Sequence, residues 1–265
     1  MADESEVAGA SQIFPNSPQE IEKRVSLGKI GWAAPLLFLP ARTAFILFSQ
    51  GIFAAVFALQ GRASAWHAAG AWWTVWGTLA DVGCLVCLYS LTRREHLRIR
   101  DLLGPLPRWL LPKGIACFLL IFPFFLLGVP LASWIVYHTW QPPIPMGEIW
   151  GRHLPHWAIL YSLLIWWPIW SATEEFTYQG YLASRFAALS RHRWAVYCLV
   201  GIWWALQHCF LPFVADWRLV LYRFLAFLPG VLVLLAVYLR TRRLAPLIVA
   251  HWMMDLSAAI WTLSF

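Results

Sequence analysis

The chain has 265 residues, of which 60% are hydrophobic and only 12% are charged. A soluble domain has about 25% charged residues, so this composition excludes an ordinary soluble domain. A membrane-spanning helix needs roughly 20 apolar residues, and the apolar content is enough for about seven of them. The apolar runs are continuous rather than alternating, which argues against a β-barrel. The net charge of +7 is the excess of basic residues expected in cytoplasmic loops, so we predict no nucleic-acid binding.

The hydrophobic pattern predicts a polar tail followed by a membrane domain. Residues 1–30 are predicted to form a flexible cytoplasmic tail, and residues 31–265 the integral membrane domain. The predicted spans, in chain order, are 43–60, 66–91, 114–137, 156–173, 194–212, 219–239 and 244–264. An eighth is possible if 31–60 contains two short elements. We therefore predict an all-α polytopic bundle of about seven or eight transmembrane helices.

Three basic segments predict the orientation of the chain in the membrane. Residues 93–100, 185–193 and 240–243 are rich in arginine, and two predicted spans separate each segment from the next. They therefore lie on the same side, which the positive-inside rule identifies as the cytoplasm. The N-terminus is then also cytoplasmic.

Four acidic residues fall inside apolar stretches: Asp81, Glu174, Glu175 and Asp255. An ionisable side chain at bilayer depth costs at least a few kcal/mol, so each one marks a candidate functional site. Asp81 stands apart from the others in the sequence. We predict that it forms a structural ion pair or hydrogen bond.

The other three acids occur with two histidines in the last part of the chain. Glu174 and Glu175 end the fourth predicted span, His208 lies in the fifth, and His251 and Asp255 lie in the seventh. Adjacent helical residues point about 100° apart, so one glutamate should face the site and the other a supporting partner. His251 and Asp255 have i, i+4 spacing and share a helix face. Such carboxylates and histidines can activate a water molecule, directly or through a metal.

Simpler interpretations of the same residues stay open. His208 can be a hydrogen bonder in helix packing, and His251 and Asp255 can merely satisfy each other. Glu174 and Glu175 can reach toward lipid headgroups at a helix end. The predicted spans also place the histidines at different depths: His208 lies about 21 Å from its basic end and His251 about 12 Å from its own.

The order of these motifs resembles the CPBP family, named for CAAX proteases and bacteriocin processing and also called Abi. The family pattern is E-E-x-x-x-R, an aromatic-x-x-x-H and H-x-x-x-N/D. Glu174-Glu175 match the first motif, Trp204 to His208 the second, and His251 to Asp255 the third. The resemblance covers about residues 160–260 and is to bacterial members, which implies the bacterial inner membrane.

The resemblance implies an intramembrane endopeptidase acting on a peptide or protein substrate near the bilayer. Members are polytopic helical proteases, and the eukaryotic branch removes the last three residues after prenylation of a CAAX cysteine. By this resemblance Glu174 activates the water with help from His208, and Glu175 orients the site. His251 and Asp255 stabilise the oxyanion or, with Glu174 and His208, bind a metal such as Zn²⁺.

Three departures from the family pattern support alternative functions. Gln179 replaces the arginine of the first motif, Trp204 is the aromatic residue of the second, and Asp255 stands where asparagine is common. An ionised aspartate only accepts hydrogen bonds, which favours a metal-ligand role for Asp255 over an oxyanion role; the alternative is that Asp255 is protonated. One alternative is a catalytically degenerate scaffold or bacteriocin self-immunity protein. A second is a proton-coupled transporter that uses the four intramembrane acids.

Overall fold

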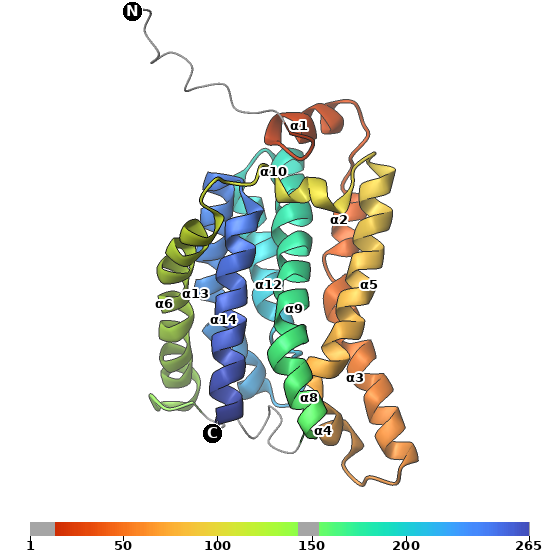
Figure 1. Ribbon diagram of the computed structural model, residues 1–265, viewed down its shortest axis with the longest axis vertical. Coiled ribbons are helices and arrows are strands. Elements are labelled where there is room, and N and C mark those ends of the chain that lie inside the picture. Colours follow the sequence, from red (N-terminus) through yellow and green to blue (C-terminus); the bar gives the residue numbers. More distant parts are fainter. Residues whose placement is uncertain (1–13, 143–153, 265) are drawn as a thin grey trace, which may run out of the picture.

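The computed structural model describes residues 14–142 and 154–264, which form a bundle of helices without a β-strand (Figure 1). The N-terminal helices are α1 (Pro18–Ser26), α2 (Ala33–Phe38), α3 (Ala41–Leu59), α4 (Ala65–Gly70), α5 (Trp73–Arg94), the 3₁₀ helix η1 (Ile99–Leu103) and α6 (Leu110–Tyr137). The C-terminal helices are α8 (His156–Tyr161), η2 (Ser162–Trp166), α9 (Trp167–Glu174), η3 (Glu175–Ala183), α10 (Ser184–Ser190), α11 (Arg193–Val196), η4 (Tyr197–Gly201), α12 (Ile202–Gln207), α13 (Trp217–Thr241) and α14 (Leu244–Ser264). Segments η2, η3 and η4 are π-helical. The predicted all-α architecture is confirmed.

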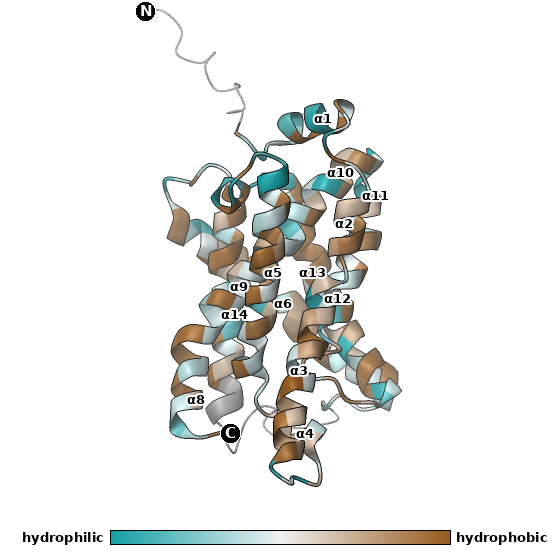
Figure 2. Cartoon of the chain, turned by 90° about the vertical axis from the view of Figure 1, so that its right-hand side faces the viewer, coloured by the Kyte–Doolittle hydropathy of each residue, from teal (hydrophilic) through white to brown (hydrophobic). Residues whose placement is uncertain are grey.

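Four helical segments of the described chain are long and apolar enough to cross a membrane: Ala33–Leu59, Trp73–Arg94, Leu110–Tyr137 and Trp217–Thr241. Leu244–Ile260 is a shorter apolar helix. Large apolar side chains face outward along the bundle, and Figure 2 shows hydrophobic residues along its length and hydrophilic ones on α1. Outward apolar surface with polar groups inside is the arrangement that lipid demands, so the chain is an integral membrane protein.

The fourth predicted span is part of a longer helix, which corrects the predicted position of the two glutamates. The helix continues without a break from α8 to α10, and Glu175 has helical φ and ψ of −62° and −43°. It ends only where Arg191 adopts the left-handed conformation, with φ of 59°. Glu174 and Glu175 therefore lie inside this helix rather than at its end. Between them and Ser190 the sequence has no proline to stop the helix.

The fifth predicted span is shorter than the sequence pattern indicates. Helix α12 ends at Gln207, and His208 is its C-terminal cap residue. The apolar residues that follow form a loop, in which Phe210 and Phe213 make an isolated β-bridge. Asp216 then caps α13 by accepting a hydrogen bond from the Arg218 amide at 2.9 Å. A continuous apolar run thus contains both a helix and its connecting loop.

The start of α14 removes the predicted mismatch in depth between the two histidines. A Cβ atom on Gly180 would lie 3.1 Å from Leu244 Cδ2, so α14 begins beside the middle of η3 rather than at the end of the bundle. His251 lies about 10 Å further along α14, because each helical residue rises 1.5 Å. It therefore reaches the depth of Glu175, whose Oε1 is 3.0 Å from His251 Nδ1.

The N-terminal segment is partly ordered, which corrects the prediction of a flexible tail over residues 1–30. Residues 1–13 lie outside the described part of the chain, but α1 packs through Ile21, whose side chain is fully buried. Asn16 donates a hydrogen bond to the Gly180 carbonyl at 3.0 Å and accepts one from Arg185 at 2.6 Å. Arg185 is itself buried in α10 and pairs with Glu95 at 2.5 Å, so it is not part of a basic loop.

The basic segments nevertheless gather at one end of the bundle, as predicted. The C-terminal ends of α5, α10 and α13 all lie at the end marked by α1 (Figure 1).

Helix α6 stands at the edge of the bundle and packs closely on α13, because a Cβ on Gly128 would lie 2.1 Å from the Ala226 carbonyl oxygen. Glycine at such a contact lets two membrane helices approach closely.

Candidate active site

Glu174 lies at the centre of the bundle, and its side chain is fully buried. Its Oε2 accepts a hydrogen bond from Trp204 Nε1 at 2.7 Å, and its Oε1 accepts one from Gln207 Nε2 at 2.5 Å. A guanidinium nitrogen of Arg42 lies 3.5 Å from Oε1. Each carboxylate oxygen has two acceptor positions, so one position on each oxygen stays available. These contacts hold the carboxylate in one orientation.

Glu175 points to a different partner, as the helical geometry predicts. Its Oε1 lies 3.0 Å from Nδ1 of His251 on α14. Its other oxygen is buried without a hydrogen-bond partner in the described part of the chain. The two adjacent carboxylates therefore have separate surroundings: Glu174 faces α12, and Glu175 fixes the ring of His251.

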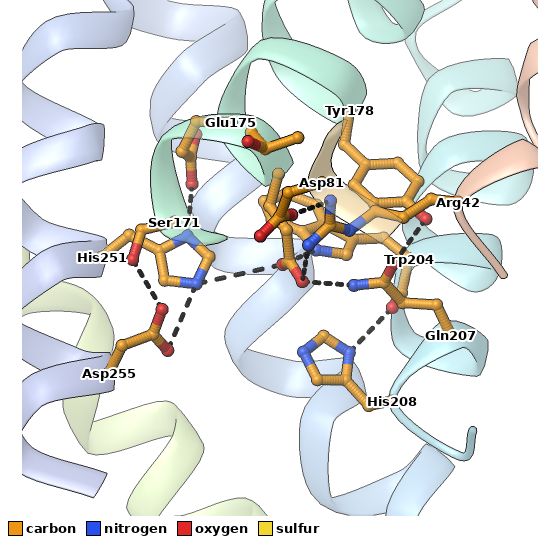
Figure 3. A network of polar contacts seen from close by, with 12 residues as sticks. Arg42, Asp81, Ser171, Glu175, Tyr178, Trp204, Gln207, His208, His251 and Asp255 are labelled. Carbon is orange, nitrogen blue, oxygen red and sulfur yellow. Dashed lines mark hydrogen bonds and ion pairs between the residues drawn. The ribbon is translucent and has the colours of Figure 1, made fainter. Parts of the chain in front are cut away.

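His251 joins the two glutamates to Asp255 (Figure 3). Its Nε2 lies 3.9 Å from Glu174 Oε2 and 3.7 Å from Asp255 Oδ1. Asp255 also accepts a hydrogen bond from the Ser171 hydroxyl at 2.5 Å. His251 and Asp255 do lie on one helix face, but each also contacts a residue of another helix. They do not merely satisfy each other.

His208 is held in a defined tautomer at the end of α12. Its Nδ1 lies 2.9 Å from the carbonyl oxygen of Trp204. A carbonyl only accepts hydrogen bonds, so Nδ1 carries the proton and Nε2 of the neutral ring is an acceptor. The ring stacks on Phe227 with a centroid distance of 4.0 Å and an interplanar angle of 16°.

The two histidines and Asp255 meet at one cavity of about 210 Å³ between α6, α13 and α14. The polar residues of its wall are Trp204, His208, His251, Asp255 and Ser257. The rest is mainly apolar, with Phe122, Phe125, Leu126, Val129, Phe227, Val231, Leu234 and Met254. Glu174 lies directly behind this polar wall, because it contacts both Trp204 and His251. The sequence-predicted site residues are thus brought together, although they come from three separate motifs.

Asp81 forms the structural ion pair that was predicted for it, and its partner is Arg42. The two side chains are fully buried and 2.7 Å apart. Arg42 also lies over the ring of Trp170, 4.1 Å from its centroid, and approaches Glu174. The role of Arg42 was not predicted from the sequence. The sequence does contain an indication of this role, because an arginine in an apolar span needs an acidic partner.

Two further residues near Glu174, Gln207 and Tyr178, were not predicted from the sequence as members of the site. Gln207 donates to Glu174 and accepts a hydrogen bond from the Tyr178 hydroxyl at 2.8 Å. The Tyr178 ring stacks on Trp204 with a centroid distance of 5.1 Å. Trp204, Gln207 and His208 have i, i+3, i+4 spacing, which places them on one helix face. That spacing could have identified Gln207 as a member of the site.

Gln179 stands where the family pattern has an arginine. Its side chain is fully buried, and neither its amide nitrogen nor its oxygen has a hydrogen-bond partner among the described residues. A cation still approaches the first glutamate of the motif, but it is Arg42 from α3. The loss of the motif arginine therefore does not leave the buried carboxylates without a positive charge.

The arrangement does not fit a metal ion held by Glu174, His208, His251 and Asp255. Within residues 14–142 and 154–264, no group of three or more His, Cys, Asp or Glu side chains is placed to bind one. Both oxygens of Glu174 accept hydrogen bonds from side chains, and both ring nitrogens of His251 lie against carboxylates of the protein. Zinc ligands instead direct an oxygen or nitrogen lone pair at the ion. No step of the reaction is therefore assigned to a metal ion.

Comparison with known proteins agrees with the three motifs. No curated protein and no solved structure matches the chain. Residues 155–257 match the family model described as type II CAAX prenyl endopeptidase Rce1-like. The matched segment contains both glutamates, His208, His251 and Asp255. At the level of the family it implies a protease, and this region of the chain is therefore Rce1-like, as the motifs predict.

Proposed function

We propose that this protein is an intramembrane endopeptidase in which Glu174 and His208 activate the attacking water. The observation that carries the proposal is the meeting of His208, His251 and Asp255 at one cavity, with Glu174 fixed behind its polar wall. The Rce1-like region supports the protease class. A scaffold without catalytic activity has no need for a buried carboxylate held by two hydrogen-bond donors beside an arginine, since such a group costs several kcal/mol to bury.

In the proposed reaction the water lies between Glu174 and the acceptor nitrogen Nε2 of His208. One of its protons passes to Glu174 as its oxygen attacks the carbonyl carbon of the substrate, while Nε2 of His208 accepts a hydrogen bond from the water. The carbonyl π bond opens and gives a tetrahedral intermediate with a negative oxygen. When this intermediate collapses, the C–N bond breaks and the proton passes to the leaving amine. The products are a carboxylic acid and an amine, which balances the hydrolysis.

His251 is the proposed donor to the negative oxygen of the intermediate. Nδ1 donates to Glu175, so a donor at Nε2 requires a ring that carries both protons. Glu175 and Asp255 lie on either side of this ring and balance its positive charge. Asp255 is thus proposed to fix the position of His251, rather than to donate a hydrogen bond itself. Donors that are already oriented act without reorganisation during the reaction.

The substrate is proposed to be a peptide segment at the membrane, which enters the cavity beside α6. The wall formed by α6 and α13 is apolar, so it suits an apolar side chain or an attached lipid. The basic end of the bundle is proposed to face the cytoplasm of a bacterial cell, because arginines accumulate on that side of the inner membrane. Residues 1–13 would then also be cytoplasmic.

The test of this function is hydrolysis by the full chain in phosphatidylcholine liposomes. The probe is a farnesylated peptide with a CAAX-type end, and the products are identified by mass spectrometry. We expect Glu174→Gln to reduce the rate by about 10³-fold, within the range of general acid–base catalysis. Glu22→Gln makes the same chemical change at an exposed position of α1 and should leave the rate unchanged.

Two results would favour the other functions. Hydrolysis at the wild-type rate by both Glu174→Gln and His208→Ala would contradict the mechanism. A cellular phenotype that survives both substitutions, but not loss of the whole protein, would support a scaffold or self-immunity role. A proton flux across the same liposomes that requires Glu174, without hydrolysis of the peptide, would support a transporter.

A further inference from the structure

Arg223 is a buried cation that the proposed mechanism does not use. It lies on α13 with 6% of its surface exposed. One guanidinium nitrogen donates a hydrogen bond to the Pro212 carbonyl at 2.5 Å. No carboxylate pairs with it in the described part of the chain, where its titratable neighbours are Cys209, Tyr222 and Tyr137. A buried charge is normally paired, because removing it from water is costly.

The surroundings of Arg223 connect it to the active site. It lines a cavity of about 100 Å³ together with His208 and Asp255. This cavity lies beside the start of α5, and the rings of Trp73 and Trp166 form part of its wall. His208 and Asp255 also line the larger apolar cavity beside α6. His208 and Asp255 thus lie between an apolar cavity and a small cavity that contains a cation.

The other charged residue in the small cavity is already engaged. Asp255 accepts a hydrogen bond from Ser171 and lies 3.7 Å from His251. Arg223 has five N–H donors, and within residues 14–142 and 154–264 it makes one hydrogen bond, to the Pro212 carbonyl. Its remaining donors suit a planar acceptor with two oxygens, since a guanidinium binds a carboxylate through two parallel hydrogen bonds.

We propose that Arg223 binds the C-terminal carboxylate of the peptide substrate and sets specificity for a free chain end. This inference rests on the proposed endopeptidase function. Pockets that enclose a whole small molecule have volumes of about 300–1,000 Å³. A cavity of about 100 Å³ can therefore hold only the end of a chain. The peptide would run from the apolar cavity past His208 to Arg223, so the bond cleaved lies close to the C-terminus.

The first test measures binding without cleavage, in the Glu174→Gln background in phosphatidylcholine nanodiscs. The probes are two farnesylated peptides of one sequence, one with a free C-terminal carboxylate and the other with a C-terminal amide. We expect the acid to bind roughly 10- to 100-fold more tightly, as for a hydrogen-bonded charged pair. Adding Arg223→Gln should remove this preference. Arg218→Gln, at an exposed position of the same helix, should retain it.

A third peptide separates the two sources of a carboxylate. It ends in a glutamate residue whose own C-terminus is an amide. Binding as tight as that of the acid would overturn the assignment to the chain end and indicate an acidic side chain instead. Equal binding of acid and amide to the chain with Arg223 intact would overturn the proposal altogether.

A second measurement separates recognition from a structural role in holding Pro212. In the otherwise wild-type enzyme, Arg223→Gln should raise KM for the acid peptide and leave kcat/KM for the amide peptide within twofold. A merely structural role would lower hydrolysis of both peptides equally. Arg223→Lys keeps the charge but not the two-pronged geometry, so we expect it to fold and to show an intermediate preference. The same preference as wild type in Arg223→Gln would contradict the proposal.

The two proposals can fail separately. If the acid peptide binds preferentially through Arg223 but no peptide is cleaved, the endopeptidase function fails and the binding site stands. If Glu174→Gln abolishes cleavage while acid and amide bind equally well, the endopeptidase function stands and the role of Arg223 fails.

Discussion

The N-terminal helices α2 to α6 and the Rce1-like region 155–257 make different contributions to one site. The reacting groups all come from the Rce1-like region, where the three motifs lie. The arginine closest to Glu174 comes instead from α3, and its ion-pair partner Asp81 comes from α5. The motifs thus supply the chemistry, while helices outside them supply the charge that balances it. Recognising the motifs alone therefore leaves unexplained the buried Arg42–Asp81 pair and the cation that it places beside Glu174.

The largest effect is expected from Arg42→Met, which removes the cation that the N-terminal helices place beside Glu174. This substitution leaves Asp81 and Glu174 buried without their cation, so we expect a loss of about 3–5 kcal/mol of unfolding free energy. Arg42→Met/Asp81→Asn removes both charges of the pair and should recover most of that stability. Chemical denaturation in detergent micelles measures both variants.

The double variant also tests whether the N-terminal helices act on the chemistry. Glu174 still lacks the guanidinium at 3.5 Å, so we expect hydrolysis to stay at least about 10-fold below wild type, equivalent to about 1.4 kcal/mol. Recovery of both stability and rate would mean that Arg42 serves Asp81 alone. The N-terminal helices would then contribute to the packing of the site and not to its chemistry.

A smaller effect is expected within the Rce1-like region from Glu175→Gln. The amide oxygen can still accept from His251 Nδ1, but the carboxylate charge that stabilises the doubly protonated ring is lost. A loss of about 1.4 kcal/mol of that stabilisation corresponds to a fall in kcat of roughly 10-fold, with little change in KM. The unfolding free energy should change by less than about 1 kcal/mol. A loss of stability as large as that of Arg42→Met would show that Glu175 has a structural role.

The sequence predicts the helical bundle and the members of the motifs well, because both depend on local patterns. Apolar runs identify the membrane helices, and i, i+4 spacing places His251 and Asp255 on one face. The divergence of Glu174 and Glu175 also follows from helix geometry. Each of these depends only on residues near one another in the chain.

Features that depend on packing between distant segments could not be predicted. Hydrophobicity does not show that α14 begins beside Gly180, yet this contact sets the depth of His251. It also does not distinguish the end of α12 from the apolar loop that follows. Arg42 is visible as an isolated cation, but its approach to Glu174 depends on how α3 and α5 pack against α9.

A slight effect is expected from Asp255→Asn, which restores the residue common in the family pattern. The side-chain oxygen of asparagine can accept from the protonated Nε2 of His251, and its amide can donate to the Ser171 hydroxyl, which can donate in turn to the Trp167 carbonyl. We expect hydrolysis within about threefold of wild type, since both residues can fix the ring of His251. Asp255→Leu removes these contacts and should lower the rate by at least about 10-fold. Equal rates for the asparagine and leucine variants would exclude a positioning role for Asp255.

The smallest effect is expected from removing metal ions. This treatment tests whether side chains or a metal ion hold the carboxylate of Glu174. If Trp204, Gln207 and Arg42 hold its carboxylate, dialysis against a zinc chelator should leave hydrolysis of the farnesylated peptide within about twofold of the untreated enzyme. A zinc peptidase treated alongside is the control for chelation. Activity that disappears on dialysis and returns with added Zn²⁺ would contradict this arrangement. The Rce1-like region would then hold its glutamate through a metal, and the guanidinium of Arg42 would serve the ion pair with Asp81.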